Sequence, residues 1–141
     1  MKIKFEDNLI LYLNNEYLKY KNYSISKIED NFKSIFETLK YCYNIEIKGY
    51  YDIDIYIDEA YGIIIEMKKE NLEFDYDDQI DMRISIHKQP FLYQIDDIYI
   101  NNKIYKYKNK YYINKYNIEH SIPIYKTNDI YKYAKTIEIK K

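Results

Sequence analysis

Residues 45–68 read IEIKGYYDIDIYIDEAYGIIIEMK, and this stretch decides the fold. In its first half apolar and polar residues alternate, so that an isoleucine row shares one face and a row of charged residues the other. This period of two is typical of a β-strand with one buried face. Gly49 interrupts the row and predicts a bulge or a bend. Gly62 is expected in the left-handed position of a hairpin loop, before a second strand that begins at Ile63.

The segment before this ribbon predicts the one long helix of the chain, from about residue 26 to residue 42. Ser26 and Glu29 have the spacing of a capping box at a helix N-terminus. Behind them apolar residues recur at steps of three and four and form a single stripe, namely Ile28, Phe32, Ile35, Phe36, Leu39 and Tyr43. Such a stripe indicates an amphipathic helix that packs on a sheet.

Shorter alternating stretches predict the remaining strands, at 2–5, 9–13, 80–86, 91–100, 104–108, 111–116 and 136–140. A short helix is expected near 128–134. The predicted fold class is therefore α+β: an antiparallel, strongly twisted β-sheet meander packed by one principal amphipathic helix. At 141 residues the chain is expected to form a single domain, 1–141.

The net charge of −1 conceals a division of charge along the chain. Residues 1–100 contain 20 acidic and 12 basic residues, whereas residues 101–141 contain 3 acidic and 10 basic ones. The two parts could bind partners of different kinds, or the basic part could dock on the acidic part.

Several classes of protein lack support in the sequence. Cys42 is the only cysteine, which excludes an internal disulfide and a cysteine-based zinc site. No window of about 18 apolar residues predicts a membrane span, and the N-terminus does not resemble a signal peptide, so we expect a cytoplasmic protein. The abundance of Ile, Tyr, Lys and Asn is typical of proteins from a low-GC bacterium or its phage.

Four reactive side chains are expected together on the polar face of the hairpin: Asp52, Asp54, Glu66 and Lys68. An acid on one strand followed by Glu-x-Lys on the next resembles the local signature of the PD-(D/E)xK nucleases. That resemblance implies a nuclease in which the acids bind Mg²⁺ and Lys68 steadies developing charge. The usual proline before the acid is absent. Apart from this alternative, the sequence implies no metal or cofactor, and the other interpretation of the cluster is a solvated strand face.

An acidic surface that contains tyrosine is the basis of the leading hypothesis. It combines the polar face of the ribbon with an acidic stretch after it, that is Asp52, Asp54, Tyr56, Asp58, Glu73, Asp75, Asp77 and Asp78. Acids attract a basic partner, and tyrosine is enriched in protein interfaces. We therefore expect a non-enzymatic accessory or inhibitor protein that binds another protein, such as an enzyme that handles nucleic acid.

A second alternative is a module that binds RNA or single-stranded nucleic acid through the hairpin at 104–116. Lysines alternate there with aromatic residues, and the candidate contacts are Lys106, Lys108, Lys110, Tyr112 and Lys115. Ammonium groups can contact phosphates while aromatic rings stack on bases. If the tyrosine face packs on the core, however, the rings are unable to stack and the lysines only guard a strand edge.

Overall fold

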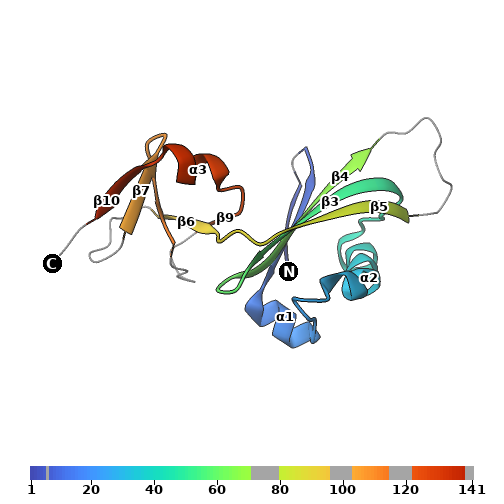
Figure 1. Cartoon of the computed structure of the whole chain (residues 1–141). Coiled ribbons are helices and arrows are strands. Elements are labelled where there is room, and N and C mark those ends of the chain that lie inside the picture. Colours follow the sequence, from blue (N-terminus) through green and yellow to red (C-terminus); the bar gives the residue numbers. More distant parts are fainter. Residues whose placement is uncertain (6, 71–79, 96–102, 115–121, 139–141) are drawn as a thin grey trace. The chain divides into compact units, whose positions relative to one another are not determined.

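The computed structural model describes residues 1–5, 7–70, 80–95, 103–114 and 122–138 (Figure 1). The contacts of the chain divide it into two compact units. Unit 1 contains residues 1–56 and 62–87, and unit 2 contains residues 57–61 and 88–141. The α+β class is confirmed, but the strands belong to two five-stranded sheets and not to one meander.

The sheet of unit 1 has the strand order β1-β2-β4-β3-β5. Its strands are β1 (Lys2–Phe5), β2 (Leu9–Asn14), β3 (Gly49–Asp58), β4 (Gly62–Glu70) and β5 (Ile80–His87). The predicted alternation in β3 is confirmed, because Ile53 and Ile55 are buried while Asp52 and Asp54 stay partly exposed. In β2 and β4 the residues of both faces are largely buried, since these strands lie in the middle of the sheet.

One strand pair of this sheet corrects the prediction of an antiparallel meander. β3 and β5 run parallel, with Ile53 opposite Ile84 and Asp54 opposite Ser85. The chain leaves the hairpin at the end of β4 and returns on the far side of β3, so β5 has the direction of β3. Alternation fixes which face of a strand is buried, but it leaves the neighbour and the direction open.

Two helical segments of unit 1 lie on the same side of the sheet in Figure 1. α1 (Asn15–Lys21) follows β2 directly and was not predicted. The predicted long helix is a 3₁₀ turn, η1 (Ile28–Asn31), that continues into α2 (Phe32–Tyr43). The capping box is not formed: Ser26 Oγ lies 3.1 Å from Ser24 Oγ, and η1 begins without a side-chain cap. No described helix is long and apolar enough to cross a membrane.

Unit 2 contains the second sheet, in the order β10-β7-β8-β6-β9, and every pair whose register is known is antiparallel. The strands are β6 (Leu92–Ile95), β7 (Lys103–Tyr107), β8 (Lys110–Ile113), β9 (Ile122–Ile124) and β10 (Lys135–Glu138). The short helix expected near 128–134 is α3 (Asn128–Tyr133), and its Ile130 is buried with Leu92 and Tyr112.

Candidate functional site

The polar face of the first sheet carries most of the candidate residues, and two of its acids have a basic side chain on the neighbouring strand. Asp52 lies directly opposite Arg83 in the β3–β5 register, and the Arg83 Nε lies 3.8 Å from Asp52 Oδ1. The same oxygen is buried and has no hydrogen-bond partner among the described residues. The ion pair is long and its arginine is mostly exposed, so it contributes little stability.

A three-residue group lies farther along the same face. His87 Nε2 lies 2.9 Å from Asp54 Oδ1, within hydrogen-bonding distance. The His87 ring also stacks on the Tyr56 ring, with centroids 4.6 Å apart and planes inclined by 17°. Burial, followed by the charges of Asp54 and Glu66, raises the pKa of the Tyr56 phenol to about 12. Tyr56 is therefore neutral at physiological pH, and its hydroxyl can donate a hydrogen bond.

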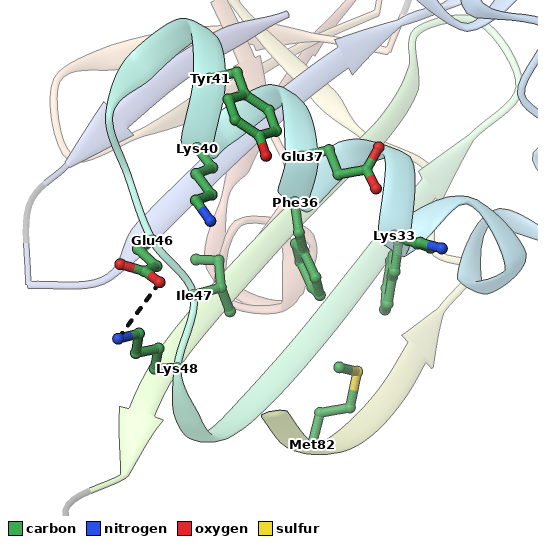
Figure 2. A pocket seen from close by; sticks show the side chains of 10 residues that line it. Lys33, Phe36, Glu37, Lys40, Tyr41, Glu46, Ile47, Lys48 and Met82 are labelled. Carbon is green, nitrogen blue, oxygen red and sulfur yellow. Dashed lines mark ion pairs between the residues drawn. The ribbon is translucent and has the colours of Figure 1, made fainter. Parts of the chain in front are cut away.

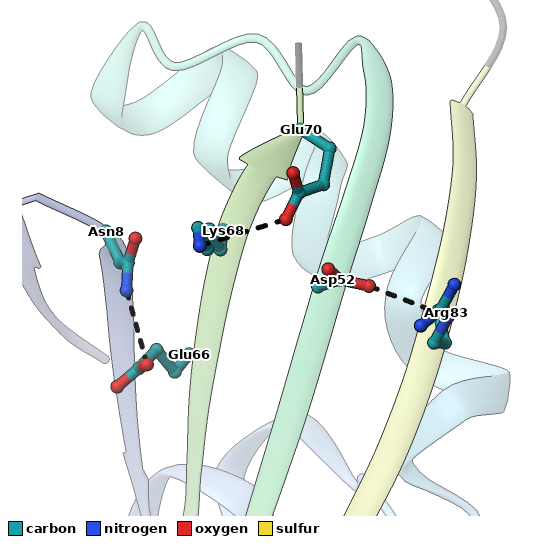
Figure 3. Close-up of polar contacts among 6 residues, drawn as sticks. All are labelled: Asn8, Asp52, Glu66, Lys68, Glu70 and Arg83. Atoms are coloured by element: carbon teal, nitrogen blue, oxygen red, sulfur yellow. Dashed lines mark hydrogen bonds and ion pairs between the residues drawn. The ribbon is translucent and has the colours of Figure 1, made fainter. Parts of the chain in front are cut away.

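Glu66 differs from its prediction as an exposed carboxylate, because only 7% of it is exposed. β4 is a central strand, with β2 on one side and β3 on the other, so Glu66 is flanked by side chains of both neighbours and lies opposite Ile10. The Asn8 side-chain amide donates a hydrogen bond to Glu66 Oε1 at 3.3 Å, as Figure 3 shows. A buried acid with a hydrogen-bond donor beside it is expected for such a position.

Lys68 turns toward the end of β4, where its Nζ lies 3.9 Å from Glu70 Oε1 (Figure 3). The four candidates of the nuclease alternative therefore have different partners: Arg83 for Asp52, His87 for Asp54, Asn8 for Glu66 and Glu70 for Lys68. Among the residues that the structure describes, no group of three His, Cys, Asp or Glu side chains is arranged to hold a metal ion.

Asp58, expected at the partner surface, forms hydrogen bonds within unit 2. Its Oδ1 accepts from the Ala60 N–H at 2.7 Å. Its Oδ2 accepts from the Phe91 N–H at 2.7 Å and from the Tyr93 hydroxyl at 3.3 Å. These bonds connect the tip of the β3–β4 hairpin to Phe91, which directly precedes β6, and to Tyr93 within β6. The other acids of the predicted surface, Glu73, Asp75, Asp77 and Asp78, lie outside the described residues.

The lysine-rich hairpin forms between β7 and β8. Its turn is Lys108-Asn109, one residue earlier than predicted, and both residues have a positive φ, as a two-residue type I′ turn requires. Lys106, Lys108 and Lys110 are exposed.

Tyr112 is not available for stacking on a base, because only 6% of it is exposed and it packs in the core of unit 2. The lysines instead cover rings of the hairpin itself: Lys106 Nζ lies 5.8 Å from the Tyr111 ring centre and Lys108 Nζ 5.3 Å from that of Tyr107. Lys115 lies outside the described residues.

The polar face also contains residues that the sequence analysis did not assign to the site, above all Arg83 and His87. Their signal was present, since both stand on the polar side of the alternating stretch 80–86 or directly after it. They were missed because only the parallel β3–β5 pairing brings them beside Asp52 and Asp54.

A pocket of about 630 Å³ opens beside α2 on the other side of the sheet. Figure 2 shows Phe36, Ile47 and Met82 on its apolar wall. Charged side chains surround this wall, and two of them form an ion pair in which Lys48 Nζ lies 3.4 Å from Glu46 Oε1. The pocket shows that α2 leaves the sheet incompletely covered near β5.

Comparison of the chain with protein-family models, with curated proteins and with solved structures finds no match in any of the three. The functional proposal therefore depends on the residues and their geometry.

Proposed function

We propose that this chain is a non-enzymatic, cytoplasmic protein of a low-GC bacterium or its phage that binds another macromolecule through the polar face of unit 1. The contact surface would be centred on Asp52, Asp54 and Tyr56. The observation that carries the proposal is the partial exposure of both carboxylates, 35% for Asp52 and 37% for Asp54, beside a neutral tyrosine. Tyrosine is enriched at interface centres, and carboxylates beside it can accept hydrogen bonds from a basic partner.

The distribution of charge supports a basic partner. Unit 1 contains 16 acidic and 11 basic residues, whereas unit 2 contains 7 acidic and 11 basic ones. The field of unit 1 therefore favours a positively charged surface, such as that of an enzyme that handles nucleic acid. Arg83 makes the face itself mixed in sign, so its specificity would come from the pattern of charges and not from net charge alone.

Photo-crosslinking in cells of a low-GC bacterium tests this proposal. A photoreactive residue replaces Lys68, which is exposed beside the polar face, and in a matched control it replaces Tyr20, an exposed residue of α1. We expect a discrete adduct from position 68 and none from position 20. The double substitution Asp52→Asn and Asp54→Asn should remove the adduct, and added salt should weaken it. No adduct at position 68, or one that survives both changes, contradicts the proposal.

A second candidate function, binding of RNA or single-stranded nucleic acid by unit 2, is favoured by the exposed lysines of the β7–β8 hairpin. With Tyr112 buried, the contact would depend on phosphates. Lys108→Glu with Lys110→Glu should lower the affinity for a single-stranded oligonucleotide and flatten its salt dependence. An equal number of lysine-to-glutamate changes on α1, at Lys19 and Lys21, is the control. Unchanged affinity in the hairpin variant contradicts this candidate.

The Mg²⁺-dependent nuclease stays a prediction. Incubation with single- and double-stranded DNA and RNA in the presence of Mg²⁺ or Mn²⁺ would reveal cleavage. Cleavage that Glu66→Gln abolishes would support it, and cleavage that persists in this variant would assign the activity to a contaminant.

A further inference from the structure

The strand β5 lies at the edge of the first sheet, with β3 as its only neighbour among the described strands. The Met82 N–H donates a hydrogen bond to the carboxylate of its own neighbour Asp81 at 2.9 Å, which indicates that it points away from β3. Successive backbone groups of a strand point in opposite directions within the sheet. The N–H and C=O groups of Met82, Ile84 and Ile86 therefore point to the open edge.

The side chains of the same three residues are only partly covered. Ile86 is 48% exposed, and Met82 and Ile84 are intermediate. Met82 also lines the pocket that α2 leaves open in Figure 2. An edge strand with an uncovered apolar row is a template for pairing with another strand.

We propose that two copies of this chain associate by antiparallel pairing of β5 with β5, which joins their five-stranded sheets across a two-fold axis. In the register that we infer, Ile84 lies opposite Ile84 of the second copy and Met82 lies opposite Ile86. The apolar rows then meet on one face. On the other face Asp81 lies opposite His87, and Arg83 lies opposite Ser85.

Charge and direction select this register. The outward backbone groups of 82, 84 and 86 must pair with one another, which permits only shifts by an even number of residues. Moving the two-fold axis onto Arg83 would place the two arginines directly opposite each other, which is unfavourable. Moving it onto Ser85 would place Met82 opposite Lys88, which lies beyond the end of β5. Moving it onto Met82 would leave Ile86 without an apolar partner within the described strand. In the inferred register the Met82 N–H bonds to the second copy, and the Asp81 carboxylate is released toward His87.

Sedimentation velocity over a micromolar concentration series tests the association. A single strand pair is a small interface, so we expect exchange between monomer and dimer with a micromolar dissociation constant. Ser85→Arg places like charges opposite each other twice per dimer and should raise this constant about tenfold. The substitution is compatible with the folded unit, because Ser85 is exposed and lies opposite Asp54. Ser85→Ala and Ser26→Arg are controls that should leave the constant unchanged.

Disulfide trapping tests the register in a Cys42→Ser background, since Cys42 is exposed. Ile84→Cys should form an intermolecular disulfide, because paired Cα atoms on the two-fold axis lie about 5.5 Å apart. Ile86→Cys should not, because residue 86 and its copy would be about 13 Å apart along the strands. A monomer at every concentration, or a dimer that Ser85→Arg leaves intact, overturns the proposal. A disulfide at position 86 but not at position 84 overturns the register.

Discussion

Gly62 has the stricter steric requirement of the two glycines. Its φ is +129°, and a Cβ built there would lie 2.5 Å from the Leu13 carbonyl oxygen. Gly49 also has a positive φ, of +90°, but its Cβ would approach only the flexible end of the Lys69 side chain, at 3.4 Å. Both glycines thus have a backbone conformation that other residues rarely adopt, and they differ in the space around them.

We expect Gly62→Ala to lower the free energy of unfolding by about 3 kcal/mol or more, because backbone strain and a clash with backbone atoms add. Gly49→Ala should cost about 1–2 kcal/mol, since only the strain remains. Urea denaturation of both variants measures the difference. If both variants lose the same free energy of unfolding, the chain relieves the clash between the new Cβ and the Leu13 carbonyl oxygen without a measurable loss of stability.

The Tyr56 phenol provides a prediction about pH. Its pKa is about 12 in the folded chain against 10.0 for an ordinary tyrosine, so the unfolded chain loses this proton first as the pH rises. The contribution of Tyr56 to stability is therefore complete below pH 10 and is lost between about pH 10 and pH 12. NMR titration of ring-labelled tyrosine, assigned with Tyr56→Phe, measures the pKa directly. Asp54→Asn should lower it while burial keeps it above 10; a titration near 10 in the unsubstituted chain contradicts the account.

At the scale of elements, the start of α1 shows how one side chain sets a helix boundary. Asn14 is the last residue of β2 and the N-cap of α1, and its Oδ1 accepts a hydrogen bond from the Tyr17 N–H at 2.9 Å. Asn31 holds the corresponding position before α2 but makes no side-chain cap bond. The preceding 3₁₀ turn leads directly into that helix.

Asn14→Ala should therefore destabilise the chain by about 1 kcal/mol, the usual effect of removing an N-cap. Asn31→Ala is the matched control and should change stability by less than about 0.5 kcal/mol. Thermal or urea unfolding of the two variants distinguishes them. If Asn31→Ala lowers the free energy of unfolding as much as Asn14→Ala does, the side-chain cap does not explain where α1 begins.

The elements that could be predicted were those whose pattern depends on nearby residues. The alternation of β3 and the spacing of Ile28, Phe32, Ile35 and Leu39 report burial of one face, and both were found. The burial of Glu66 could not be predicted, because it depends on β4 being a central strand. The pairs Asp52–Arg83 and Asp54–His87 depend likewise on a parallel neighbour that local pattern does not specify.

For the whole molecule, the division into two units bears on how the chain unfolds, and the single domain expected from the sequence stays a prediction. The hairpin formed by β3 and β4 bears on it. Its strands belong to the sheet of unit 1, but its tip, residues 57–61, belongs to unit 2. There Tyr61 packs on Phe91, with ring centres 6.0 Å apart, and Asp58 bonds to the Phe91 N–H.

We expect one cooperative unfolding transition in urea, because residues 57–61 of unit 2 are continuous in the chain with β3 and β4, whose strands form part of unit 1. Hydrogen exchange of amides in β4 and in β8 should show the same free energy of global opening. Asp58→Ala should shift both sets of amides together. Two separate transitions, with β8 opening first, would show instead that the units are two domains.

Because the hairpin tip belongs to unit 2, the chain is also limited in how it can be divided into independent parts. A break after His87 would give one fragment in which Tyr61 lacks its aromatic neighbour, and another in which the Phe91 N–H has no carboxylate to accept its hydrogen bond. Neither half could be exchanged between proteins as a ready-made module. Recombination would have to transfer the tip residues together with the C-terminal half, so the two sheets are expected to be inherited together.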